Sequence, residues 1–192
     1  MLFNLNFNQL DDALLHILKQ NPALSNSLLA DGTRTAKNVT QIMAPVLSAH
    51  SRCQVTKYYI QAVSIDREIF LTTNLSGGAK IYATHAASSW LIGRGATCAI
   101  SVPEPSVSRR HAVIGHHVPE GFFITDLGSS NGTRIDQLPL AAGTRQGLKD
   151  GTLIQMGDLK LEFFTACQTD LDQAVPADEH ITAAGNPQSF EL

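Results

Sequence analysis

The sequence has few cysteines, no paired metal-binding motif and no long apolar run, and these absences exclude several classes of protein. Its three cysteines, Cys53, Cys98 and Cys167, stand far apart without a C-x-x-C spacing. This pattern predicts neither a disulfide framework nor a zinc site, and an odd number of thiols fits a reducing compartment. No apolar run approaches the ~18 residues that a membrane span requires. We therefore expect no metal or cofactor and no membrane association.

Basic charge is also scarce. The formal net charge is −3, and the segment from Gln168 to Leu192 holds five acidic residues without a Lys or Arg. The rest of the chain is close to neutral, which argues against a nucleic-acid partner. The first residues, MLFNLNFNQLDD, contain no basic stretch and no cleavage site, so they predict no signal peptide. These features together predict a cytoplasmic protein.

Residues 1–54 are predicted to form a small helical region. Apolar residues recur at helical spacing from Gln9 to about Gln20, after Asn8 as a candidate N-cap, and Pro22 then stops the helix. A second short apolar segment spans Leu24 to Leu29.

A third apolar stripe runs from Val39 to Leu47 and contains Pro45, which we expect to kink or shorten the helix. Packing against the next domain explains such stripes. Self-association through residues 8–50, or binding of a partner helix, remains open because apolar stripes alone do not distinguish these roles.

From about Val55 the pattern changes to short β-favouring runs separated by turn residues. Many short strands with frequent turns and almost no helical periodicity predict a mainly β protein, an antiparallel β-sandwich over residues 55–166. Residues 167–192 then read as a flexible acidic tail. The clearest turn is Lys149–Thr152. The expected strands are Tyr58–Ile65, Ile69–Leu71, Lys80–Thr84, Trp90–Ile92, Ile100–Val102, His111–His116, Phe122–Asp126, Arg134–Ile135, Thr152–Met156 and Lys160–Phe164.

Three short motifs carry the chemistry of the chain. They are Gly93-Arg94, Ser108-Arg109-Arg110-His111 and Ser130-Asn131-Gly132-Thr133. Arginine donors form short charge-assisted bonds to phosphate, and hydroxyl and amide groups satisfy the remaining acceptors. This set of residues suits an oxyanion that carries more than one charge.

The same motifs, in this order on this strand pattern, resemble the forkhead-associated (FHA) domain. The matching words are WLIGR, SVSRRHAVI, DLGSSNGTRI and LKDGTLIQMG, and the matching core runs from about Ile81 to Phe164, with the sheet beginning near Tyr58. The resemblance implies a β-sandwich that binds phosphothreonine peptides. It also implies a non-catalytic adaptor whose partners are phosphothreonine-containing substrates of a Ser/Thr kinase.

The resemblance gives five residues a role in binding. Arg94 is similar to the family's main phosphate ligand, and Ser108 to the hydroxyl that donates to a phosphate oxygen. Arg109 matches a position whose side chain often joins the phosphate. Asn131 matches the residue that binds the ligand's main chain, and Ser130 is a neighbouring contact. Ordinary explanations exist beside these roles: a surface ion pair, a turn-stabilising serine, a solvated arginine or a left-handed asparagine.

Four more residues are expected to support the site rather than to bind. By resemblance, Gly93 keeps the first loop tight and His111 bonds backbone so that the serine loop keeps its shape. Gly132 and Thr133 are turn architecture.

A serine and a histidine close in sequence also suggest a nucleophile and a base. We reject a hydrolase built on Ser108 and His111, because a triad needs an orienting acid and an oxyanion hole, and only the acid, Asp126, can be nominated. We expect no catalytic residues. The alternative function is structural assembly, in which the sandwich and the N-terminal helices make phosphate-independent protein–protein contacts.

Two further expectations concern the loops. Ser106, Val107 and Arg134 are candidates for reading the ligand residue three places after the phosphothreonine, which is where the family usually finds its selectivity. The segment Asp136-Gln137-Leu138-Pro139 replaces the Asn-Gly turn common in the family. We therefore expect a longer hairpin there.

Overall fold

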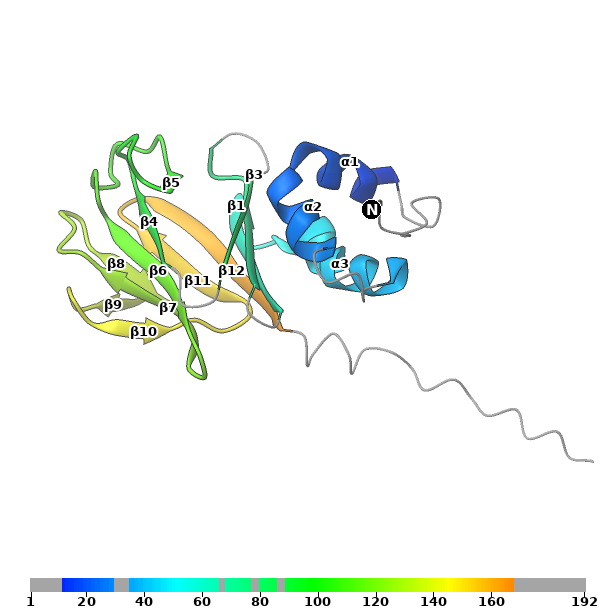
Figure 1. Ribbon diagram of the computed structural model, residues 1–192. Helices are drawn as coiled ribbons and strands as arrows, with labels where there is room; N and C mark the ends of the chain where they lie inside the picture. The colour runs from blue at the N-terminus through cyan, green and yellow to red at the C-terminus, as the bar shows by residue number, and fades with distance from the viewer. Residues whose placement is uncertain (1–11, 30–34, 66–67, 77–79, 86–88, 168–192) are drawn as a thin grey trace, which may run out of the picture.

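The computed structural model describes residues 12–29, 35–65, 68–76, 80–85 and 89–167 (Figure 1). The helices are α1 Asp12–Gln20, α2 Pro22–Leu29 and α3 Ala36–Arg52. The strands are β1 Tyr58–Ile65, β2 Glu68–Thr73, β3 Lys80–His85, β4 Ser89–Gly93, β5 Ile100–Ser101, β6 Ala112–His117, β7 Gly121–Asp126, β8 Thr133–Ile135, β9 Leu138–Leu140, β10 Arg145–Gly147, β11 Thr152–Met156 and β12 Leu159–Cys167.

The strands form two sheets, one ordered β3-β2-β1-β12-β11-β8-β9 and the other β10-β7-β6-β4-β5. The predicted mainly β sandwich with a small N-terminal helical region is confirmed. Both sheets are mixed, however, because β1 pairs with β12 and β4 with β5 in parallel, while the remaining pairs are antiparallel. The β1–β12 pairing joins the first and last strands of the sandwich.

Each run of residues expected to form a strand does so, but β9 and β10 were missed. Both lie at a sheet edge. The residues of β10 are all exposed, and β9 contains Pro139 between two leucines. Short exposed edge strands lack the apolar alternation that marks a half-buried strand, so only their pairing with a neighbour defines them.

The expectation of a longer β8–β9 hairpin was wrong. Ile135 pairs with Leu138, which leaves a two-residue turn at Asp136 and Gln137. Both turn residues have positive φ, 47° and 71°, a conformation more common for Asn-Gly. The Asp136 carboxylate compensates by accepting a 2.8 Å hydrogen bond from the Leu153 amide of β11.

The main core lies between the two sheets, and a second core lies between one sheet and the helices (Figure 1). Strand β1 contributes side chains to both cores, one from each face. Ile60 and Ala62 point into the sandwich, whereas Val63 joins Phe70 of β2 in the cluster formed with the helices. A strand buried on both faces is apolar nearly throughout, which accounts for the continuous apolar run in this part of the sequence.

Helix α3 runs through Pro45 to Arg52, so the expected shortening does not occur. Its start is fixed by a capping box, in which Thr35 accepts from the Asn38 amide and the Asn38 side chain accepts from the Thr35 amide. Met43 and Ala49, one on either side of Pro45, are both fully buried. Packing on both sides therefore outweighs the hydrogen bond lost at the proline. The predicted N-cap, Asn8, lies outside the described residues.

Two charged side chains tie the end of α3 to the sandwich. Arg52 makes two 2.7 Å bonds to the Asp150 carboxylate, donates to Gln61 and stacks 4.4 Å from the centre of the Phe164 ring. Glu162 is buried and accepts from the backbone amides of Val55 and Thr56. The linker from helix to strand is thus fixed by hydrogen bonds to β12.

None of the helices in the described part of the chain is long and apolar enough to cross a membrane. Apart from Cys167, the predicted acidic tail lies outside the described residues.

Candidate binding site at the rim of the sandwich

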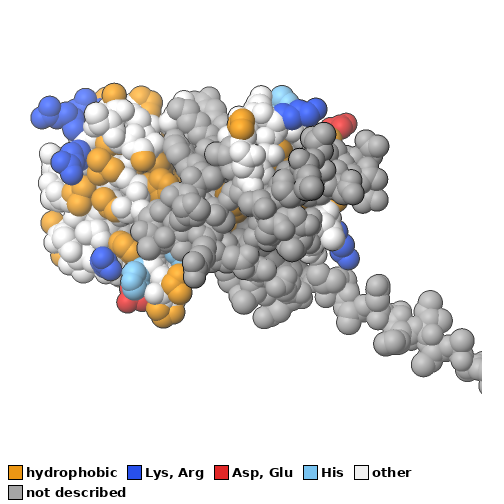
Figure 2. Space-filling view, in the orientation of Figure 1, with side chains coloured by type: hydrophobic (Ala, Val, Ile, Leu, Met, Phe, Trp, Pro, Cys, Tyr) orange, Lys and Arg blue, Asp and Glu red, His pale blue; other side chains and the backbone are white. Residues whose placement is uncertain are grey.

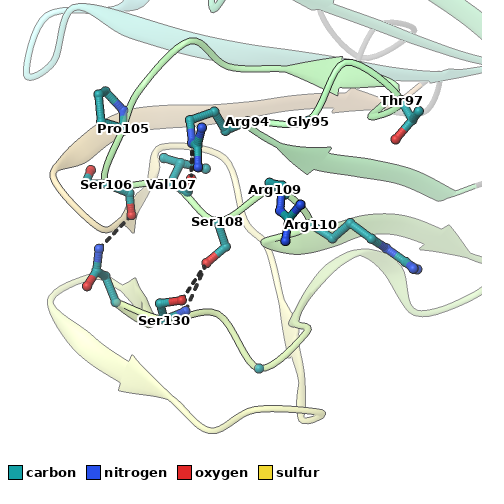
Figure 3. A pocket seen from close by; sticks show the side chains of 12 residues that line it. Arg94, Gly95, Thr97, Pro105, Ser106, Val107, Ser108, Arg109, Arg110 and Ser130 are labelled. Carbon is teal, nitrogen blue, oxygen red and sulfur yellow. Dashed lines mark hydrogen bonds between the residues drawn. The ribbon is translucent and has the colours of Figure 1, made fainter.

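The three motifs meet in one open depression at a rim of the sandwich, with a volume of about 620 Å³. Figure 3 shows the side chains around it, which come from the loops after β4, before β6 and before β8. All five residues predicted to bind line this depression: Arg94, Ser108, Arg109, Ser130 and Asn131. The other described residues of its lining are Gly95, Thr97, Pro105, Ser106, Val107, Arg110 and Gly128.

The first loop depends on a close approach of two backbones at Gly93. A Cβ atom at this position would lie 2.5 Å from the Arg109 carbonyl oxygen and 2.9 Å from that of Ser108. Immediately beyond it, the Arg94 amide donates to the Ser108 carbonyl at 2.9 Å, and the Gly95 amide donates to the Arg109 carbonyl at 3.0 Å. The absence of a side chain at Gly93 therefore lets the arginine and serine loops pair.

Arg94 is exposed and partly held in place. Its Nε donates to the Val107 carbonyl at 3.3 Å. This bond uses one of the five N–H donors of the guanidinium and leaves the two terminal nitrogens for a ligand. No carboxylate among the described residues pairs with Arg94.

Ser108 and Ser130 connect the second loop to the third. The Ser108 hydroxyl oxygen accepts a 2.9 Å bond from the Ser130 amide, and the two hydroxyl oxygens lie 3.4 Å apart. The Ser108 hydroxyl donates to the Ser130 hydroxyl in the longer of these two bonds. At 3.4 Å this bond is weak, so the Ser108 proton can turn to donate to a ligand oxygen instead.

His111 is fully buried beneath these loops. Its Nδ1 accepts a 3.0 Å bond from the Ser108 amide, so the proton sits on Nε2, which donates to the Gly132 carbonyl at 3.2 Å. Burial lowers the pKa of His111, although the Gly132 carbonyl and the Asp126 carboxylate oppose that shift. The neutral imidazole thus bridges the serine loop and the asparagine loop.

This geometry does not pair Ser108 and His111 as nucleophile and base. The imidazole bonds the backbone amide of Ser108, while the hydroxyl is bonded to the Ser130 amide. Both ring nitrogens have backbone partners.

Asp126 organises the third loop from the end of β7. Its carboxylate accepts from the amides of Gly128 and Ser129, both at 2.8 Å, and from the hydroxyls of Ser129 at 2.7 Å and Thr133 at 2.6 Å. Burial by itself raises the pKa of Asp126, but these four bonds outweigh it and the net shift is downward. A charged, buried carboxylate therefore folds the loop that presents Ser130 and Asn131.

Asn131 closes the other side of the depression. Its Nδ2 donates to the Ser106 carbonyl at 2.8 Å, and Ser106 is itself held by the Asp158 amide, which donates to the Ser106 hydroxyl at 2.9 Å. The amide oxygen of Asn131 and its second N–H are left for a ligand backbone. Gly132 follows with a φ of +73° and turns the chain into β8.

The electrostatics of the depression are one-sided. Arg94, Arg109 and Arg110 line it, and no Asp or Glu appears in its described lining. Figure 2 shows Lys and Arg side chains at the end of the sandwich away from the helices, with no Asp or Glu next to the uppermost of them in this view. Such a surface favours an anionic ligand.

The sequence of this part of the chain matches a known family. The FHA domain family model matches residues 90–157. Those residues belong to the FHA domain family. FHA domains are phosphothreonine-binding modules and are generally non-catalytic. The match contains every residue in the described lining of the depression.

Relatives of the FHA domain include very large proteins. The chain is 36% identical over 76 residues to mediator of DNA damage checkpoint protein 1 of Rattus norvegicus, covering 38% of this chain and only 6% of that protein. Among solved structures, it is similar to the FHA domain of CT664 from Chlamydia trachomatis, with 19% identity, a TM-score of 0.41 and coverage of 50% of this chain and 93% of that one. A second FHA domain, solved in an analysis of phosphothreonine-dependent interactions, shows 27% identity, a TM-score of 0.39 and coverage of 55% and 92%.

The three candidates for reading the peptide divide between two depressions, and the structure adds a role for Asp126. Arg134, a candidate for reading the peptide, lies in a separate depression with Gln137 and Lys160, whereas Ser106 and Val107 do line the main one. Asp126 was considered only as a catalytic acid. The signal for its structural role was present, because an Asp followed by Gly and Ser is typical of a turn in which the carboxylate bonds the next backbone amides.

Proposed function

We propose that this chain binds phosphothreonine-containing peptides in the depression, as a non-catalytic cytoplasmic adaptor for Ser/Thr kinase substrates. One observation carries the proposal: Arg94, Ser108 and Asn131, from three separate loops, line a single depression whose described lining contains no carboxylate. The FHA family match supports the same ligand class.

The donors suit a phosphate group. A phosphothreonine brings about −1.5 to −2 charge and three acceptor oxygens. Arg94 offers its terminal guanidinium nitrogens, and Ser108 offers a hydroxyl proton whose oxygen is already positioned by the Ser130 amide. In this proposal Arg109 adds charge beside the phosphate and Ser130 makes a neighbouring contact.

The remaining groups suit a peptide rather than free phosphate. Asn131 is anchored to the Ser106 carbonyl and keeps one acceptor and one donor free, which is what an extended ligand backbone requires. In this proposal the loops are held in position before the ligand arrives by Gly93, His111, Gly132 and Thr133. Binding therefore costs little conformational entropy.

The experiment is calorimetric titration of a phosphothreonine peptide, selected from a library on the full chain, against wild type and Arg94→Ala. Losing a charge-assisted bond of about 1.5–3 kcal/mol weakens binding tenfold or more. The unphosphorylated peptide and Lys37→Ala, a change on the exposed face of α3, serve as controls. The proposal is contradicted if Arg94→Ala binds the phosphopeptide as tightly as wild type does, or if wild type binds the unphosphorylated peptide equally well.

Self-association through residues 8–50, the alternative drawn from the sequence, has weaker support. Leu14, Leu28 and Met43 are fully buried in a cluster that includes Val63 and Phe70 of the sandwich, so these parts of the apolar stripes are already covered. Sedimentation of the full chain over a range of concentrations tests this alternative, and a monomer throughout counts against it.

A further inference from the structure

The depression holds more positive charge than one phosphate neutralises. Three guanidiniums line it, from Arg94, Arg109 and Arg110, and Asp and Glu are absent from its described lining. A phosphothreonine supplies at most about two negative charges. The neighbouring cations repel one another until a ligand neutralises them, so a ligand with an additional negative charge fits better than one without.

Arg110 is the cation least able to reach the phosphate. In Figure 3 its side chain extends away from Ser108, on the side opposite Ser106. Asn131 lies on the Ser106 side, because its side chain donates to the Ser106 carbonyl. The side chain is exposed and has no hydrogen bond or ion pair with any residue that the structure describes. An arginine with this placement is positioned to contact a residue of the peptide a few positions away from the phosphothreonine.

We propose that Arg110 is a specificity-determining residue that selects a second negative charge on the peptide. This inference rests on the proposed function and extends it. The charge lies on the side of the phosphothreonine away from Asn131. An extended peptide rises about 3.3 Å per residue, so the charged residue is within a few positions of the phosphothreonine and on one side of it only. Aspartate, glutamate and a second phosphorylated residue share this chemistry.

The test is a peptide series with one fixed phosphothreonine and uncharged flanks, in which a single aspartate is moved through every nearby position on both sides. Affinities are measured for the full chain, for Arg110→Glu and for Lys37→Glu, which makes an equivalent charge change on the surface of α3. We expect about threefold to fivefold tighter binding for aspartate on one side, the upper range for a solvent-exposed ion pair. A phosphoserine at the best position distinguishes a phosphate from a carboxylate.

Arg110→Glu should abolish this preference and favour lysine at the same position, whereas Lys37→Glu should leave it unchanged. The preference should also shrink in 1 M salt, where the screening length falls to about 3 Å. The inference is overturned if aspartate raises the affinity equally on both sides of the phosphothreonine, or if the preference for aspartate survives Arg110→Glu. If the uncharged peptide binds in an Arg94-dependent way and aspartate has no effect, this inference alone fails. If no phosphate-dependent binding occurs, the proposed function fails with it.

Discussion

The buried carboxylate of Asp126 gives the most direct test of how the third loop is held. Replacing Thr133 by valine removes one of its four donors, the hydroxyl at 2.6 Å, and keeps the shape of the side chain. Thr133 is 1% and Asp126 2% exposed, so water cannot replace the lost donor without rearrangement. A hydrogen bond to a charged group contributes about 1.5–3 kcal/mol. We therefore expect Thr133→Val to lower the free energy of unfolding by about 2 kcal/mol.

Urea unfolding measures this loss. With a slope of roughly 1–3 kcal/mol per molar for a small protein, the midpoint should fall by about 1 M. Thr125→Val is the matched control, because Thr125 is half-buried in β7 and its hydroxyl makes no hydrogen bond within the described structure. A midpoint for Thr133→Val no lower than that of Thr125→Val would refute the role assigned to the carboxylate.

The pH dependence provides a second reading of the same contact. The pKa of Asp126 is lowered in the folded state, so its charge contributes stability above the unfolded value of about 3.9. That contribution is lost as the pH falls through the folded pKa. The difference in free energy of unfolding between wild type and Thr133→Val should therefore be largest near neutral pH and become smaller below about pH 4.

Two further predictions concern Gly93 and two buried histidines, His111 and His116. Gly93→Ala should lower the free energy of unfolding by about 1–3 kcal/mol and weaken peptide binding, because its Cβ would meet the Arg109 carbonyl at 2.5 Å. Gly147→Ala is the unfolding control, because a Cβ there would have no atom within 4 Å. Equal stability of the two variants would count against the close approach at Gly93. Burial lowers the pKa of His111 and of His116, so stability present above about pH 6.5 should fall as the solution is acidified, by up to about 1.4 kcal/mol per pH unit for each imidazole. His116→Phe should reduce that slope in urea titrations between pH 7.5 and 5.5, and an unchanged slope would exclude His116 as a contributor.

Much of the fold followed from local patterns in the sequence. Ile154 and Met156 of β11 are buried and alternate with half-buried neighbours, which is the period-two signal of a half-covered strand. Pro22 both ended the first helix and began α2, since proline is tolerated at the first helical position. These features depend on neighbours a few residues apart, so the chain order alone reveals them.

The candidate site was accessible to the same reasoning only in part. The residue types of Arg94, Ser108 and Asn131 indicated an oxyanion ligand, and the structure brings all three to one depression. Arg134 has the same chemistry as Arg94 but lies in a different depression, because position in the sheet rather than residue type decides which loop end a side chain faces.

The sequence by itself determined the strand-rich composition, the order of the three motifs and the chemistry of the ligand they suit. Tertiary structure decided the parallel joining of β1 to β12, the continuation of α3 through Pro45 and the edge strands β9 and β10. It also decided the use of Asp126 as the buried centre of a loop. The β1–β12 pairing, the β7–β10 pairing and the packing of α3 depend on contacts between segments distant in the chain, whose free energy exceeds the local preferences that a sequence displays. The hydrogen-bond partners of Asp126 and the β8–β9 pairing are close in the sequence, so there the structure decided the choice among local alternatives.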